Sequence, residues 1–224
     1  LPGLLQFASQ SERVSSSYRS SVSKGLREFA GALSGRAIGN NGQQALLVSD
    51  LHNNTLSIAE IKKLADHRPV FAAGDFTHEG GSIENKKMLR AVKDLGQPLV
   101  VVSGNHDTQA LMIKMAQSGA IVLSERGPLL RENVKNPMIV VDGMKVFGVA
   151  DPNQGNVTIE RKTPLSKTQR EIFLSSLSQK IRRLGPNIVL IHDSGLAASL
   201  ASSLRDLPIT FLTGHNHLQE VSRW

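Results

Sequence analysis

The chain of 224 residues has no cysteine and few aromatic residues, and each lack excludes a class of site. Without cysteine it can form no disulfide and offer no thiolate, so a bound metal would need His, Asp, Glu, Asn or backbone oxygen as ligands. The longest apolar runs have the length of a strand, too short to cross a membrane as a helix. Seven Phe, one Tyr and one Trp provide few platforms on which nucleic-acid bases could stack.

The rest of the composition is typical of a folded globular domain, with 40% hydrophobic and 20% charged residues. This length predicts one domain with a substantial core. The formal net charge of +7 favours anionic partners, namely phosphorylated substrates, nucleic acid or an anionic lipid surface. Because the basic residues are scattered and form no run longer than a pair, a mildly basic solvated surface is the simpler interpretation. Composition fixes neither the cellular compartment nor the oligomeric state.

The serine-rich residues 1–44 differ from the remainder and contain none of the polar motifs described below. Their spacing of apolar residues predicts an amphipathic helix followed by a linker, with the stripe formed by Val14, Tyr18, Val22, Leu26, Phe29 and Leu33. One interpretation is a helix that packs across the following domain, residues 45–224. The other interpretation is a juxtamembrane segment. In that case the sequence would be the excised soluble part of a membrane-anchored protein, since it begins without Met and without a signal-peptide pattern. The domain is also expected to be truncated after Trp224.

From residue 45 onward, apolar runs of strand length alternate with amphipathic stretches of helical period. Strands are expected at residues 45–48, 70–73, 99–102, 120–123, 188–191 and 209–212. Helices are expected at 56–65, 83–95, 108–118, 168–184 and 196–204. A hairpin is expected over 138–149 about Asp142-Gly143. This order predicts an α/β fold in which sheets form a sandwich flanked by helices.

Five polar clusters follow apolar runs, and six of the seven histidines lie in them. Ligand sites of α/β sheets gather beyond the carboxyl ends of the strands, so the clusters are expected to meet in one pocket. Carboxylate, imidazole and carboxamide groups brought together there indicate a metal site rather than a packed core. The clusters are Asp50-Leu51-His52, Gly74-Asp75-Phe76-Thr77-His78, Gly104-Asn105-His106-Asp107, Ile191-His192-Asp193 and Gly214-His215-Asn216-His217.

This ligand chemistry suits a pair of divalent cations, which clamp the attacking and leaving oxygens of a phosphoryl group. Asp75 is the natural bridge, because a carboxylate has two oxygens to divide between two metals. Asp50 and His52, two residues apart on an extended segment, would point to the same side and chelate one ion. The same spacing joins His215 and His217. Each motif alone is common in structural roles, and it is their joint occurrence in order that favours a metalloenzyme.

With all five clusters in this order, residues 45 to about 219 resemble the calcineurin-like metallophosphoesterase superfamily. The resemblance implies a four-layer fold, a two-sheet β-sandwich flanked by helices, to which the N-terminal helix is an addition. It also implies a dinuclear centre of Mn, Fe, Zn or Co ions. One ion would be held by Asp50, His52, Asp75 and His217, and the other by Asp75, Asn105, His192 and His215.

The resemblance also implies catalytic roles. His106 would orient the phosphate and protonate the leaving oxygen, and a metal-bridging hydroxide would be the nucleophile. His78 stands where the family usually has Asp or Asn, and it is expected either to contact His106 or to be a tolerated variation. Asp107 is expected to orient its neighbours or to cap the following helix.

The expected function is hydrolysis of a phosphomonoester or phosphodiester, with a phosphorylated small molecule or nucleotide as substrate. A nuclease of the same superfamily is one alternative, although the scarcity of aromatic residues disfavours nucleic acid. A non-catalytic scaffold of this fold is the other, and the retention of every ligand position argues against it. Any membrane tether would lie outside these residues.

Overall fold

The computed structural model describes residues 44–217, whose strands form two sheets packed face to face. The predicted N-terminal helix lies outside the described residues. The first sheet has the order β1-β2-β3-β4-β5 and consists of β1 (Leu46–Val48), β2 (Val70–Ala72), β3 (Leu99–Val101), β4 (Ile121–Ser124) and β5 (Gly127–Pro128). The second sheet has the order β6-β7-β8-β9 and consists of β6 (Ile139–Val141), β7 (Met144–Val149), β8 (Ile188–Ile191) and β9 (Thr210–Leu212).

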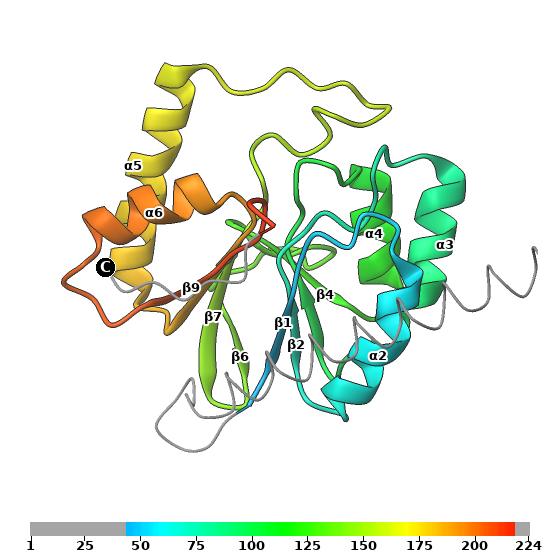
Figure 1. The fold of residues 1–224 in the computed structure, drawn as a ribbon. Coiled ribbons are helices and arrows are strands. Elements are labelled where there is room, and N and C mark those ends of the chain that lie inside the picture. The colour runs from blue at the N-terminus through cyan, green and yellow to red at the C-terminus, as the bar shows by residue number, and fades with distance from the viewer. Residues whose placement is uncertain (1–43, 218–224) are drawn as a thin grey trace, which may run out of the picture.

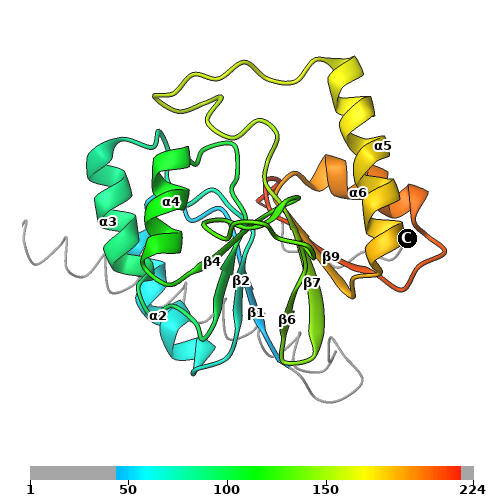
Figure 2. The ribbon, with the colours of Figure 1, turned by 180° about the vertical axis from the view of Figure 1, so that it is seen from behind.

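Helices cover the outer face of each sheet, which confirms the predicted sandwich in four layers (Figures 1 and 2). Helices on the first sheet are α2 (Thr55–Ala65), α3 (Ser82–Val92) and α4 (Gln109–Gln117). Those on the second are α5 (Lys167–Leu184) and α6 (Ser194–Ser203). None of the helices in the described part of the chain is long and apolar enough to cross a membrane.

The inner strands β2, β3 and β8 are buried on both faces, and their side chains divide alternately between two apolar layers. In β2, Val70 and Ala72 pack toward the helices, whereas Phe71 packs between the sheets. In β8, Ile188 packs between the sheets, and Val189 packs toward α5 and α6. This two-residue period is the alternation of a pleated strand. Because both faces are buried, the sequence shows continuous apolar runs at these strands.

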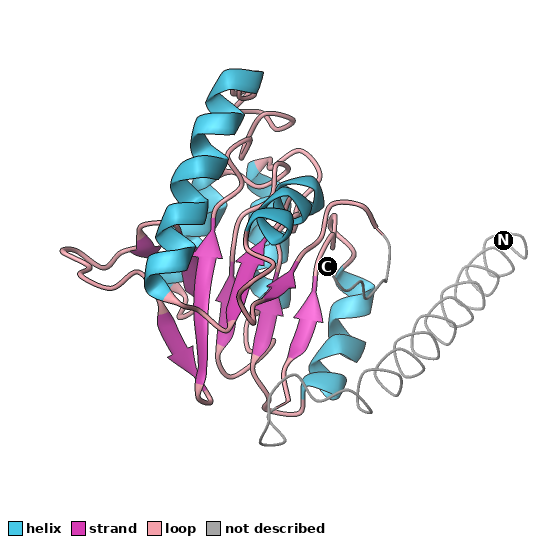
Figure 3. Cartoon of the chain, turned by 90° about the vertical axis from the view of Figure 1, so that its left-hand side faces the viewer, coloured by secondary structure: helices cyan, strands magenta, loops and turns pink. Residues whose placement is uncertain are grey.

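The direction of the strands sets the position of the polar clusters. β1, β2, β3 and β4 pair in parallel, as do β7, β8 and β9. The predicted hairpin joins β6 to β7, and Asp142 and Gly143 both have positive φ, as a tight hairpin turn requires. The carboxyl ends of β1, β2 and β3 therefore meet at one edge of the first sheet (Figure 3).

One predicted boundary is wrong by three residues. Helix α3 ends at Val92 rather than at Leu95. Lys93 leaves the helical conformation and Asp94 has a φ of 59°, but the chain turns back so that Leu95 is still 1% exposed. The apolar spacing continues to Leu95, beyond the end of the helix, because the spacing reflects which side chains are buried and not the backbone conformation.

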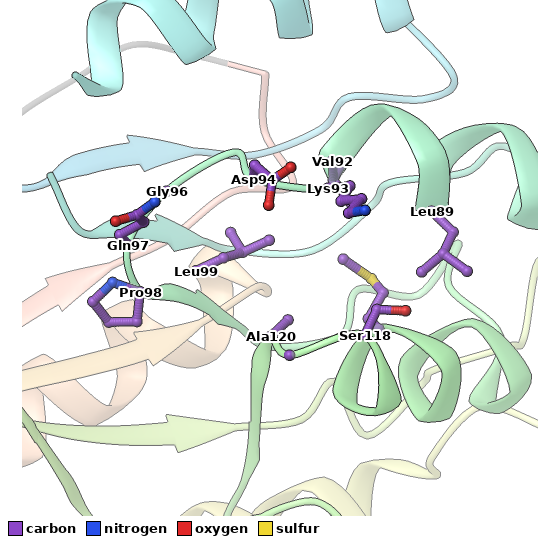
Figure 4. A pocket seen from close by; sticks show the side chains of 12 residues that line it. Leu89, Val92, Lys93, Asp94, Gly96, Gln97, Pro98, Leu99, Ser118 and Ala120 are labelled. Carbon is purple, nitrogen blue, oxygen red and sulfur yellow. The ribbon is translucent and has the colours of Figure 1, made fainter. Parts of the chain in front are cut away.

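A pocket of about 310 Å³ opens at the carboxyl ends of α3 and α4, beside the start of β3 (Figure 4). Apolar residues such as Leu89, Leu99 and Met115 line it together with the polar Lys93 and Asp94. Because β3 starts here and the third polar cluster follows the end of β3, this pocket lies at the opposite edge of the sheet from that cluster.

Packing between the sheets should dominate the stability of the fold. Phe71 is 1% exposed in the layer between the sheets, so Phe71→Ala is expected to lower the free energy of unfolding by about 3–5 kcal/mol. The matched control is Val140→Ala on β6, where the side chain is 69% exposed and the expected change is below about 0.5 kcal/mol. Urea unfolding followed by circular dichroism measures both. Equal losses in the two variants would contradict this account of the core.

Candidate metal centre

All five polar clusters come together where the carboxyl ends of the two sheets meet. The structure places three groups of donor side chains there, and in each group one donor atom per residue lies within 4.8 Å of the others. One of them consists of three histidines, His52, His78 and His106, and the other two each contain a carboxylate. Of these two, the first group is Asp50, His52 and His217, and the second is Asp75, His192 and His215. Every predicted metal-ligating residue except Asn105 belongs to one of these groups, and Asn105 contacts the second.

The second group is the tighter of the two. Nε2 of His192 lies 3.2 Å from Oδ2 of Asp75, from Oδ1 of Asn105 and from Nδ1 of His215. A divalent cation with bonds of about 2.1 Å sets neighbouring ligand atoms about 3.0–3.4 Å apart. The four donor atoms therefore have the chemistry and the spacing of a cation site. His192 is 0% exposed, and its Nδ1 lies 2.6 Å from the carbonyl oxygen of Ala73, which orients the ring.

The first group is wider and more exposed to solvent. Oδ1 of Asp50 lies 4.0 Å from Nε2 of His52 and 3.6 Å from Nε2 of His217. The rings of His52 and His217 stack with centroids 5.2 Å apart. Nδ1 of His52 lies 3.2 Å from the carbonyl oxygen of Thr77, which leaves Nε2 directed at the two carboxylates. These donors also suit a cation, after contractions of about 0.2–1 Å to the spacing of bound ligand atoms.

Asp75 lies between the two groups, but not in the way the sequence predicted. Its Oδ2 alone approaches both of them, 3.2 Å from Nε2 of His192 and 3.7 Å from Nε2 of His52. Its Oδ1 accepts a hydrogen bond of 2.9 Å from the backbone N–H of His106. The two oxygens are therefore not divided between the groups. One oxygen faces both, and the other fixes the carboxylate.

The extended conformation predicted for Asp50-Leu51-His52 is wrong, and the backbone at His215 and His217 is not extended either. Asp50, His52, Asp75, His215 and His217 all have positive φ, between 39° and 75°. Such a conformation costs a non-glycine residue about 1–3 kcal/mol. In the first segment, hydrogen bonds to the neighbouring loop hold this backbone in place, from Asp50 N–H to the Gly74 carbonyl and from His52 N–H to the Asp75 carbonyl. Curled loops, rather than strand pleating, direct the side chains of each pair.

Two glycines allow the backbones of the second and third polar clusters to come into direct contact. A Cβ atom on Gly74 would lie 2.4 Å from the backbone nitrogen of Gly104, and φ at Gly74 is +88°. A Cβ atom on Gly104 would lie 2.1 Å from Oδ1 of Asp75. Any larger residue at either position would push the second and third clusters apart.

Asp107 ties the same two loops together with its side chain. Its Oδ2 accepts hydrogen bonds from the N–H groups of Asp75 and Gly104, at 2.9 and 3.0 Å, and its Oδ1 accepts from Phe76 at 2.9 Å. Burial raises the pKa of Asp107 to about 7, against these hydrogen bonds, which favour the charged form. The predicted capping role is wrong, because Thr108 caps α4 with its side chain. The orienting role agrees with the contacts.

The two remaining predicted catalytic residues lie side by side at the opening of the site. Nδ1 of His106 lies 2.6 Å from the carbonyl oxygen of His78, and their rings stack with centroids 5.5 Å apart. Because that carbonyl can only accept, Nδ1 of His106 carries the hydrogen and Nε2 remains free. His106 also meets the ring of His52 edge to face at 4.8 Å. His78 does contact His106, with its backbone carbonyl and its ring, and its side chain is exposed.

The surroundings of His192 and His52 shift their pKa values in opposite directions. Burial disfavours charge on His192, but the hydrogen bond and the negative charge of Asp75 outweigh this and raise its pKa to about 9. Burial would raise the pKa of Asp75, but His192 outweighs it and lowers that pKa. The pKa of His52 is lowered, mainly by burial, with the charge of His106 adding to the effect. His52 is therefore ready to bind a cation near neutral pH, whereas His192 must first lose a proton.

Sequence reasoning missed Glu84, which joins the loops after β1 and β2. Its Oε1 accepts a hydrogen bond from the side chain of Asn53, and its Oε2 accepts from the N–H groups of Glu79 and Gly81. The only signal in the sequence was its place in the first turn of α3, where a carboxylate commonly binds free N–H groups. The other acidic residues near the clusters are structural, since Asp193 caps α6 and pairs with Arg170.

The donor set and the fold together match a known family. Residues 44–224 match the model of the calcineurin-like phosphoesterase superfamily domain. The chain belongs to the calcineurin-like phosphoesterase superfamily. Members of this superfamily typically bind divalent metals and hydrolyse phosphoesters.

Two solved structures are similar to this superfamily member. One is the phosphopantetheinyl hydrolase of Mycobacterium tuberculosis, at 14% identity and a TM-score of 0.50, covering 81% of this chain and 86% of that one. The other is a protein of unknown function from Aquifex aeolicus, at 13% identity and a TM-score of 0.43, covering 75% of this chain and 89% of that one. At these identities the likeness concerns the fold alone. Among curated proteins, none matches the chain.

Metal binding should release a proton from His192. Its pKa of about 9 leaves it protonated at pH 7 in the metal-free protein, so a cation must displace that proton. The apparent affinity for Mn²⁺ or Zn²⁺ is therefore expected to rise with pH up to about 9, by as much as tenfold per unit. Calorimetric titration in two buffers of different ionisation enthalpy measures the released protons. An affinity that stays constant between pH 7 and pH 8.5 would contradict the charged state of His192.

Asp107 should matter for stability as well as for metal binding. In Asp107→Asn one oxygen becomes an NH₂ group that cannot accept the backbone N–H groups, so the free energy of unfolding should fall by about 1–3 kcal/mol. Metal affinity should fall with it, because the loop that carries Asp75 loosens. Asp206→Asn, which removes only an exposed ion pair with Arg182, is the control and should change neither quantity. Thermal unfolding with and without metal provides both readouts.

Proposed function

We propose that residues 45–224 form a metal-dependent phosphoesterase domain with a dinuclear centre, preceded by the separate segment 1–44. The observation that carries the proposal is the position of Oδ2 of Asp75, between two groups of His and carboxylate donors. Membership of a superfamily that hydrolyses phosphoesters supports the reaction class. The substrate would be a phosphorylated small molecule or nucleotide, as a monoester or a diester.

The ligands divide between the two cations as the donor groups do. Asp50, His52 and His217 would hold one, Asn105, His192 and His215 the other, and Asp75 both. Two bound cations would polarise the phosphoryl oxygens and lower the pKa of a water molecule so that it can attack phosphorus near neutral pH. The donors are nitrogen and oxygen only, which suits Mn, Fe, Zn or Co.

His106 is proposed as the general acid. Its Nδ1–H donates to the carbonyl of His78, so the ring presents Nε2 toward the neighbouring ring of His52 and the donor groups. When the ring also carries a proton on Nε2, that proton can pass to the leaving oxygen of the substrate, and the ring returns to its neutral form with the hydrogen on Nδ1. Asp107 supports this role indirectly, because its hydrogen bond with the N–H of Gly104 fixes the loop that contains His106.

His78 is proposed to position the substrate. Its exposed ring stacks on that of His106, and a second imidazole there could hydrogen-bond a phosphoryl oxygen or the second ester group of a diester. The His106 Nδ1 contact uses only the backbone of position 78, so any residue could maintain it. The stacked pair also favours a nuclease as the second candidate function.

The test is a screen of the metal-reconstituted protein against p-nitrophenyl phosphate, bis-p-nitrophenyl phosphate, cyclic nucleotides and single-stranded DNA. Hydrolysis of at least one of them is expected, and the preferred substrate distinguishes monoesterase, diesterase and nuclease. Asp75→Asn should abolish turnover and weaken the occupancy of both metal sites, measured by elemental analysis, because a neutral amide replaces the shared charge. Normal turnover in this variant would remove the bridging role. Purified protein that holds no metal, with His106→Ala changing no activity, would support the scaffold alternative.

A further inference from the structure

Four exposed apolar side chains lie at the amino-terminal ends of α2 and α3 and on the loop after β7, the segments around the candidate metal centre. They are Leu56 at 43% exposure, Ile83 at 82%, Val157 at 46% and Ile159 at 64%, and we call this set the apolar rim. Within residues 44–217 only seven large apolar side chains are exposed, so more than half of them belong to the rim. Single exposed apolar residues are normal on protein surfaces, but a set gathered at one opening indicates a binding surface.

Hydrogen bonds join the three segments that carry the rim. The N–H of Ile159 donates to the carbonyl of Glu79 at 3.0 Å, which links the loop after β7 to the start of α3. The side chain of Asn53 donates to Glu84 at 2.5 Å, which links the start of α2 to the same place. Leu56, Ile83 and Ile159 each lie within four residues of one of these contacts, so the rim forms one connected border.

The same segments adjoin the catalytic residues. The N–H of Gly155 donates to the carbonyl of Asn105 at 3.1 Å, and His78 immediately precedes Glu79. In Figures 1 and 2, the long segment between β7 and α5 extends beyond the carboxyl ends of the strands and reaches across to α3 and α4. A phosphoester held at the metal centre would therefore extend its organic part toward the rim.

Positive charge accompanies the apolar groups. Lys86 and Lys87 are exposed and lie three and four residues after Ile83, on the same face of α3. A surface that pairs the almost fully exposed Ile83 with two lysines is complementary to a molecule that combines an apolar chain with negative charge.

We propose that the substrate is an anionic amphiphile, a phosphoester with an alkyl or acyl chain of about eight carbons or more. Its phosphoryl group lies at the metal centre, and its chain lies on the apolar rim beside Lys86 and Lys87. This inference rests on the proposed phosphoesterase function and specifies its substrate class. The chain adds binding energy through the apolar surface that it shares with the rim.

The test compares methyl p-nitrophenyl phosphate with octyl p-nitrophenyl phosphate, two diesters that release the same chromophore. Assays use the full chain loaded with Mn²⁺, below the concentration at which the octyl ester forms micelles. The expected kcat/KM for the octyl ester exceeds that for the methyl ester by about tenfold or more. Ile83→Ser and Ile159→Ser should each lower kcat/KM for the octyl ester about fivefold and leave the methyl ester unchanged. Val140→Ser, equally exposed but on β6, should change neither.

Equal kcat/KM for the two esters, or equal losses for both in the rim variants, would overturn the proposal while leaving phosphoesterase activity intact. If neither ester is hydrolysed, the diesterase form of the proposed function fails, and binding of octyl phosphate measured by calorimetry decides the rim separately. Weaker binding of octyl phosphate to Ile83→Ser supports the proposed contact between the alkyl chain and the rim, and unchanged binding overturns it. A third outcome would also overturn the substrate proposal. If kcat/KM does not depend on chain length, but the protein sediments with vesicles of phosphatidylcholine and phosphatidylglycerol and the rim variants do not, the rim binds a membrane surface.

Discussion

The carboxylate of Asp107 is the contact on which the metal centre depends. It is fully buried and binds three backbone N–H groups from two loops, one after β2 and one after β3. Burying a carboxylate raises the free energy of the fold unless the carboxylate is hydrogen-bonded. The N–H groups of the two loops provide these hydrogen bonds, and Asp107 in turn fixes the distance between the loops. That spacing places the N–H of His106 against Oδ1 of Asp75 and turns Oδ2 of Asp75 toward both donor groups. A carboxylate without contact to solvent thus determines the geometry of the candidate ligands.

The two sheets bring the rest of the centre into place. β8 and β9 deliver His192 and the last cluster to the edge where β1, β2 and β3 end, and the N–H of His215 donates to both oxygens of Asp50. This contact joins residues 165 positions apart in the sequence. Four of the seven candidate ligands follow strands of the first sheet, and three follow strands of the second. A centre built across two sheets requires that the apolar layer between them, with Phe71 and Leu190 in it, sets their separation correctly.

The two sheets and the position of the polar clusters could be predicted from the sequence, because burial determines the order of apolar and polar residues along the chain. Strands buried on both faces appear as apolar runs, and polar clusters after those runs indicate the edge at which they meet. Backbone conformation leaves a weaker record. The left-handed φ of Asp50 and His52 and the orientation of the Asp75 carboxylate depend on hydrogen bonds between loops distant in sequence. The roles of Asp107 and Glu84 were missed or left open for the same reason, since a carboxylate that binds backbone N–H groups has no distinctive sequence context.

The left-handed backbone at five of the candidate ligands has an evolutionary consequence. Histidine and aspartate are held there in conformations that glycine and asparagine adopt more easily, so replacing a ligand can relieve strain in the metal-free fold. Drift toward greater stability would then erode the donor groups one by one, and only selection for catalysis opposes it. A lineage of this fold that has stopped turning over substrate should therefore lose its histidines at positions 52, 215 and 217 before it loses its core.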